Sequence, residues 1–124
     1  MKKYNWLELG VIGAFTLLGA MARAESVKVD TTLNILTDEN GMTAYTFDLD
    51  RPGVSNCNGA CAVEWPPILA NEATLEAPFS VVIRKDGSRQ VAHNGQPLYL
   101  YAEDAQPGDL NGDGYSSVWH TARP

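Results

Sequence analysis

The chain has 124 residues, of which 44% are hydrophobic and 19% charged, and its formal net charge is −6. This length fits one domain, and the hydrophobic fraction is that of an ordinary globular protein. The acidic balance argues against charge-driven binding to nucleic acid or to an anionic membrane surface. The 11 glycines and 7 prolines indicate many turns, which favours short strands over long helices.

The first 24 residues have the pattern of a secretory signal peptide. Lys2 and Lys3 form a positive start, the apolar stretch 9–18 follows, and Ala22-Arg23-Ala24 is a small-residue cleavage site. The apolar stretch is shorter than the roughly 20 residues that span a bilayer, although a retained membrane anchor is the alternative. No cysteine near the cleavage site could accept a lipid. We therefore expect cleavage before Glu25 and a periplasmic or secreted protein without a membrane anchor.

Two segments repeat the pattern G-x-x-[AL]-Y-x-[FY]-x-x-D at a spacing of 54 residues, the first from Gly41 to Asp50 and the second from Gly95 to Asp104. Two tryptophans keep the same spacing. The duplication predicts two similar β units, over about 41–65 and 95–119, that share one core. We expect the matched positions to be core or turn residues: Tyr45, Phe47, Asp50 and Trp65 in the first unit, and Tyr99, Tyr101, Asp104 and Trp119 in the second.

Three turn signals indicate hairpins within these units. Asn40-Gly41, Asp86-Gly87 and Asn94-Gly95 lie between strand-forming runs, and such pairs favour tight hairpin turns. The two aspartates that end the repeated motifs are expected to cap the turns that follow them. No stretch of the mature chain shows helical periodicity. We therefore expect a mostly-β single domain over residues 25–124, built from two similar hairpin units.

The paired motifs resemble those of the bacterial secreted-repeat proteins, a group often described as lipoproteins of unknown function. The resemblance also covers the cysteine and Trp-Pro-Pro segment from Gly53 to Pro67, the run 94–99 and the C-terminal segment from Trp119. This chain departs from the lipoproteins of the group because it lacks a lipid-acceptor cysteine. The resemblance implies an architecture and brings no reaction with it.

Cys57 and Cys61 are the only two cysteines. In an exported protein such a pair indicates a disulfide, and the short loop would stabilise the fold by about 2 kcal/mol. The alternative is a copper site with His93 or His120 as a third ligand, because soft thiolates suit Cu(I).

The acidic segment Asp109, Asn111, Asp113 and Gly114 fits the first half of an EF-hand-like calcium loop. The position where such a loop carries a bidentate glutamate holds His120, which predicts weak calcium binding. The alternative is a solvated turn between two strands.

The sequence contains no nucleophile motif, and neither histidine has a nucleophile or a carboxylate at a recognised spacing. We therefore expect no enzyme. The expected function is that of an exported binding or interaction domain for an unidentified protein or small ligand, stabilised by calcium. The alternative is a periplasmic copper-handling or redox accessory protein that uses Cys57, Cys61 and a histidine.

Overall fold

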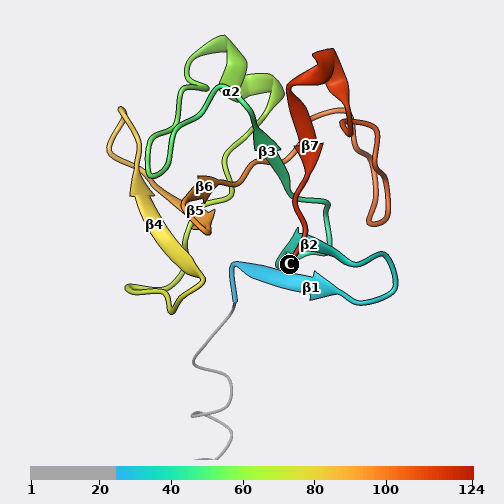
Figure 1. Ribbon diagram of the computed structural model, residues 1–124, viewed down its shortest axis with the longest axis horizontal. Coiled ribbons are helices and arrows are strands. Elements are labelled where there is room, and N and C mark those ends of the chain that lie inside the picture. The colour runs from blue at the N-terminus through green and yellow to red at the C-terminus, as the bar shows by residue number, and fades with distance from the viewer. Residues whose placement is uncertain (1–24) are drawn as a thin grey trace, which may run out of the picture.

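The computed structural model describes residues 25–124. The predicted signal peptide, residues 1–24, lies outside the described residues. The described part contains seven short strands in three small sheets and one short α-helix (Figure 1). This confirms the expectation of a mostly-β domain. None of the helices within residues 25–124 is long and apolar enough to cross a membrane.

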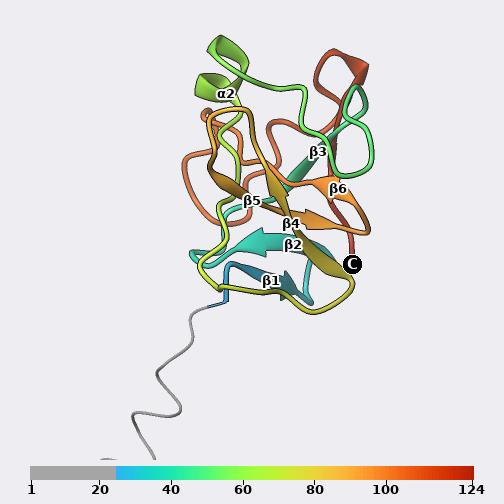
Figure 2. The ribbon, with the colours of Figure 1, turned by 90° about the vertical axis from the view of Figure 1, so that its left-hand side faces the viewer.

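The elements are β1 (Val27–Asp30), β2 (Ile35–Asp38), β3 (Tyr45–Phe47), α2 (Ala60–Glu64), β4 (Phe79–Ile83), β5 (Arg89–His93), β6 (Gln96–Pro97), a 3-10 turn (Tyr115–Ser117) and β7 (Trp119–Thr121). All strand pairs are antiparallel: β1 pairs with β2, β3 with β7, and β4 with β5, which also pairs with β6. In Figures 1 and 2 the β1–β2 pair lies at the bottom of the molecule and α2 lies at the top.

Two of the predicted hairpin turns form as expected. The Asp86-Gly87 turn joins β4 to β5, and the Asn94-Gly95 turn joins β5 to β6. Asn94 and Gly95 have φ values of 52° and 83°, and the tight two-residue turns that match strand twist require positive φ at both positions. These local signals therefore set where the chain reverses.

The aromatic strands differ from a simple hairpin arrangement. After the Asn40-Gly41 turn, only the single bridge Thr37↔Thr43 joins the chain back to β2. The β3 strand instead pairs with β7, so that Phe47 lies opposite Trp119. A turn signal acts over a few residues, whereas the choice of strand partner depends on where the large aromatic side chains can be buried.

The two units interlock through backbone hydrogen bonds that run between them. The backbones of Tyr45 and Tyr99 pair with each other through reciprocal hydrogen bonds of 2.8 and 2.9 Å. The Ala122 amide, at the end of the second unit, donates to the Ala44 carbonyl of the first (2.8 Å). The Ile68 amide, at the end of the first unit, donates to the Leu98 carbonyl of the second (3.0 Å). Each unit therefore completes the other one.

The core consists of two hydrophobic clusters that both draw on the two units. One is aliphatic, with Leu36, Ala44, Ile68, Val91, Leu98 and Ala122 as its buried members. The other is aromatic and holds Tyr45, Cys57, Trp65, Tyr99, Tyr101 and Trp119. Because both clusters mix the two repeats, the domain has one shared interior.

Candidate functional site

The repeated aromatic residues form one continuous stack of four rings. The Trp65 and Trp119 rings lie parallel with their centroids 3.9 Å apart. Phe47 stacks on the outer face of Trp119 at 4.2 Å, and Tyr101 stacks on the outer face of Trp65 at 4.1 Å. Both tryptophans are less than 5% exposed. The stack alternates between the two units, so its geometry is that of a shared core and not of an open ligand platform.

The tyrosine and the aspartate of each repeated motif form hydrogen bonds between the two units. The Tyr45 hydroxyl donates to Asp104 Oδ2, and the Tyr99 hydroxyl donates to Asp50 Oδ2, each at 2.7 Å. Each bond joins a tyrosine of one unit to the aspartate of the other. Burial, followed by the hydrogen bond to Asp104, raises the pKa of Tyr45. Burial likewise raises the pKa of Tyr99, so both phenols stay protonated and donate at neutral pH.

The two aspartates also order the loops that follow them, over longer spans than the side-chain caps we expected. Asp50 Oδ1 accepts from the Asn56 amide at 2.7 Å, and Asp104 Oδ1 accepts from the Asn111 amide at 3.0 Å. Burial raises the pKa of Asp50, while the bonds from Asn56 and Tyr99 oppose that rise. In each aspartate, Oδ1 thus binds a loop amide of its own unit, while Oδ2 accepts from the tyrosine of the opposite unit.

Cys57 and Cys61 form a disulfide, which confirms the structural interpretation of the pair. Cys57 is fully buried within the aromatic cluster. The Trp65 amide donates to the Cys61 carbonyl at 2.8 Å, so the loop leads directly into the stacked tryptophan.

A buried arginine that the sequence analysis did not select also holds this loop. Arg84 is 6% exposed and donates from Nη1 to Ser55 Oγ and from Nη2 to the Cys57 carbonyl. Since the Tyr99 hydroxyl donates to Asp50, Ser55 must donate to Tyr99 across their 2.6 Å contact. The chain of bonds thus runs from the guanidinium to the carboxylate. The alternation of side chains along β4 could have indicated that Arg84 is buried, because Arg84 follows Val82 by two residues and lies on the same buried face.

The carboxylates of the acidic loop bind backbone amides of the preceding residues and of β7. Asp109 Oδ2 accepts from the Ala105 and Gln106 amides, and Asp113 Oδ1 accepts from the Thr121 amide. The hydrogen bond from Thr121 lowers the pKa of Asp113. Asn111 is exposed.

The close packing of the acidic loop against aromatic rings explains why residue 112 is a glycine. A Cβ atom at this position would lie 2.8 Å from the Trp65 ring and 3.0 Å from the Tyr45 ring. The Gly112 amide also donates to the Tyr45 hydroxyl at 3.2 Å. The loop therefore packs edge-on against the aromatic cluster, where only glycine fits.

The two histidines contact residues other than the cysteines. His93 packs beside the Phe79 ring at 5.2 Å, and burial lowers its pKa. His120 Nε2 lies 2.8 Å from Asp48 Oδ2 on the surface. Over residues 25–124, no group of three or more His, Cys, Asp or Glu side chains is placed to hold a metal ion. The copper and calcium interpretations thus gain no support from the arrangement of side chains.

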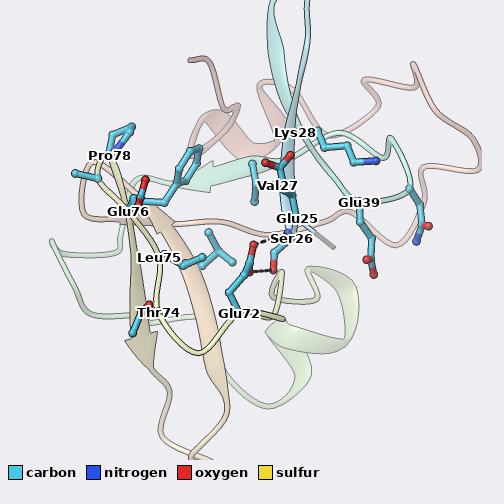
Figure 3. A pocket seen from close by; sticks show the side chains of 14 residues that line it. Glu25, Ser26, Val27, Lys28, Glu39, Glu72, Thr74, Leu75, Glu76 and Pro78 are labelled. Carbon is cyan, nitrogen blue, oxygen red and sulfur yellow. Dashed lines mark hydrogen bonds between the residues drawn. The ribbon is translucent and has the colours of Figure 1, made fainter. Parts of the chain in front are cut away.

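A groove of about 760 Å³ opens beside the first strand, at the end of the molecule opposite α2 (Figure 3). Its apolar lining consists mainly of Val27, Leu75, Phe79 and Val91, and the first three pack half-buried against the aliphatic cluster. Its charged lining consists of Glu25, Glu39, Glu72, Glu76 and Lys28. The groove therefore combines an apolar floor with acidic side chains.

Hydrogen bonds from Ser26 fix one wall of this groove. Ser26 is 3% exposed, and its hydroxyl donates to Glu72 Oε1 at 2.6 Å, while the Asn71 amide donates to Ser26 Oγ at 2.7 Å. Burial favours protonation of Glu72, but the hydrogen bonds from Ser26, together with those from the backbone of Glu72 and Asn71, outweigh it and lower the pKa of Glu72. No local pattern in the sequence pointed to this site, because its two walls are 46 residues apart.

Together, these features define a small disulfide-bonded β domain made of two interlocked repeats. A family of secreted repeat proteins of unknown function matches residues 34–69 and 80–123, which is more than half of the chain, and the chain belongs to this family. Each matched segment contains one of the two repeated motifs, Gly41 to Asp50 and Gly95 to Asp104. No curated protein and no solved structure matches the chain.

Proposed function

We propose that this protein is an exported, non-enzymatic domain that binds a partner in the groove beside β1. The description of its family as secreted supports export. The signal-peptide pattern of residues 1–24 and the disulfide support the periplasm as the compartment.

The observation that carries the proposal is the groove itself. Apolar side chains of Val27, Leu75 and Phe79 line an open cavity instead of being closed over by the chain. Binding sites are concave and combine apolar side chains with polar groups that orient the ligand, and this groove holds both kinds. None of these three residues belongs to the aromatic stack or to the disulfide loop.

The use of the repeated motif residues favours a non-enzymatic role. The paired tyrosines and aspartates are bound to one another across the unit boundary. Carboxylates engaged in this way support the architecture of the domain. They are not poised as an acid and a base around a substrate cavity.

Site-specific photocrosslinking in living cells tests the proposal. A photoreactive amino acid at the exposed position Thr74, which lines the groove, should give a defined crosslinked product in the exported fraction. The matched control is the same amino acid at Lys85, an exposed position outside the groove. Equal products from both positions, or none from Thr74, would contradict the proposal.

The copper-handling or redox function is the alternative, and it requires both thiols to be free. In the structure Cys57 and Cys61 are joined to each other. Thiol labelling and metal analysis of protein purified after export distinguish the two functions, because only the alternative predicts free thiols together with stoichiometric copper.

A further inference from the structure

The outer edge of β1 is open along the groove. β1 pairs with β2 on one side, and its two-stranded sheet has no further strand within residues 25–124. The backbone groups of Val27 and Val29 face away from β2 and take part in no hydrogen bond of the described residues. An open strand edge offers alternating N–H and C=O groups to an extended peptide. Among the groove-lining residues of β1, Val27 presents these groups at the open edge, whereas the backbone groups of Lys28 face Thr37 of β2.

The charges around the groove select the kind of peptide that fits. Four glutamates line it against one lysine, Lys28. The chain as a whole carries a net charge of −6, so a second copy of the same protein would be repelled. Charge complementarity therefore favours a basic partner.

The floor of the groove adds a second requirement. Leu75 and Phe79 are half-buried and lie beside the start of β1. Successive side chains of an extended strand point to opposite faces. A strand that pairs with β1 can thus place an apolar side chain on the floor, while its neighbours on either side point toward the acidic rim.

We propose that the groove binds an extended segment of a partner polypeptide in which an apolar residue is flanked by lysine or arginine, and that this segment adds to β1 as a further strand. This inference rests on the proposed binding function and names its partner class. The apolar side chain covers Leu75 and Phe79, and the flanking cations lie against Glu39 and Glu76.

The test uses a blocked peptide of alternating lysine and valine residues, titrated into isotope-labelled protein purified after export. The amide signals that shift on binding should belong to β1 and to residues 74–79, and binding should weaken as salt is raised. A peptide of alternating glutamate and valine should not bind. A version of the basic peptide with N-methyl groups on alternate amides should also fail, because it cannot pair with the strand edge.

Matched variants separate the groove from general charge attraction. Glu39→Gln with Glu76→Gln should weaken binding about 3- to 10-fold, since each exposed ion pair contributes modestly. Glu64→Gln with Glu103→Gln removes the same charge outside the groove, Glu64 lying in α2 at the opposite end, and should leave binding unchanged. Equal weakening by both double variants, equal binding of the acidic peptide, or shifts centred elsewhere would overturn the inference.

The outcomes also distinguish this inference from the proposed function. If Thr74 crosslinks to a defined product but the basic peptide does not bind, the groove is a binding site for a partner of other chemistry. If the N-methylated peptide binds as well as the parent peptide, strand addition to β1 is wrong.

Discussion

Tyr45 and Tyr99 show how a repeated motif acts through single side chains. Each donates a hydrogen bond of 2.7 Å to the aspartate of the opposite repeat, and each is fully buried. Asp50 and Asp104 are partly buried, and a carboxylate that loses its donor there is desolvated without compensation. The repeated tyrosine hydroxyls are therefore expected to stabilise the fold individually.

Replacing either hydroxyl should destabilise the protein. Tyr45→Phe and Tyr99→Phe should each lower the free energy of unfolding by about 1.5–3 kcal/mol, because each removes a hydrogen bond to a charged group. Urea denaturation measures the loss. Tyr115→Phe is the control, since Tyr115 is 43% exposed, and it should change stability by less than about 0.5 kcal/mol. Equal stability of all three variants would show that the cross-unit bonds carry no energy.

The same residues predict sensitivity to alkali. Burial raises the pKa of both Tyr45 and Tyr99 above the ordinary value, which is about 10. Above about pH 10 the unfolded phenols ionise while the folded ones keep their protons, so the folded state binds more protons. Stability is fully present below that pH and is lost as pH rises through the folded pKa values.

Unfolding free energies measured by urea denaturation between about pH 8 and pH 11.5 test this dependence. The parent protein should lose stability steeply in the upper part of the range. The double variant Tyr45→Phe with Tyr99→Phe should lose it less steeply, because it lacks two of the phenols whose pKa is raised. Identical slopes for the two proteins would contradict the assignment.

At the scale of elements, two loops are fastened to the aromatic stack in different ways. The disulfide loop is held by its own covalent bond and by Arg84, which donates to the Cys57 carbonyl at 2.8 Å. The acidic loop is held by its own carboxylates and by the close contact of Gly112 with Trp65. Because the first loop has two attachments, losing one of them should not release it.

Reduction of the disulfide should weaken the fold without abolishing it. The short closed loop predicts a loss of about 2 kcal/mol, and Arg84 still binds the loop. Denaturation with and without reductant measures the loss, and the double variant Cys57→Ser with Cys61→Ser should be insensitive to reductant. Complete unfolding on reduction would mean that the covalent bond alone holds the loop.

Calcium binding at Asp109, Asn111 and Asp113 stays a prediction from the sequence. A weak site with a dissociation constant of about 0.1–1 mM would stabilise the fold by about 1.4 kcal/mol at tenfold excess. The melting temperature should then rise by about 4–8 °C. Asp113→Asn should reduce this calcium-dependent rise.

Thermal melts in calcium and in magnesium give the measurement. If 10 mM calcium leaves the melting temperature of the parent unchanged, or if magnesium acts equally, the segment is a turn held by hydrogen bonds such as those from Ala105 and Thr121.

Across the whole molecule, backbone pairing between the two repeats makes them depend on each other. The last strand of the second unit pairs with β3 of the first, and Pro67, near the end of the first unit, bridges to Tyr99 of the second. Trp65 and Trp119, one from each unit, stack at the centre. Neither unit alone can bury its aromatic strand.

Fragments split between Glu76 and Ala77 test this dependence. Both residues are exposed and lie in the segment that links α2 to β4. Residues 25–76 and 77–124 should each be unfolded alone, because each lacks the strand and the tryptophan that the other supplies. When mixed in equal amounts they should fold together, with the circular dichroism and tryptophan fluorescence of the intact protein. A fragment that folds alone as a monomer would contradict the interdependence.

The sequence by itself determined which residues build this protein. The 54-residue spacing identified the aromatic positions and the two repeats, the Asn-Gly and Asp-Gly pairs located the turns, and the cysteine count predicted the disulfide. These features are readable because each depends on neighbouring residues or on a repeat within the chain.

Only the tertiary structure decided how these pieces meet. The partner of each aromatic strand, the bonds from each tyrosine to the opposite aspartate, the burial of Arg84 and the groove between β1 and the linker all join residues far apart in the chain. Such contacts follow from packing large rings into one shared interior, and no local pattern specifies them. Ser26 and Glu72, which lie 46 positions apart and share a 2.6 Å hydrogen bond at the groove, are the clearest case.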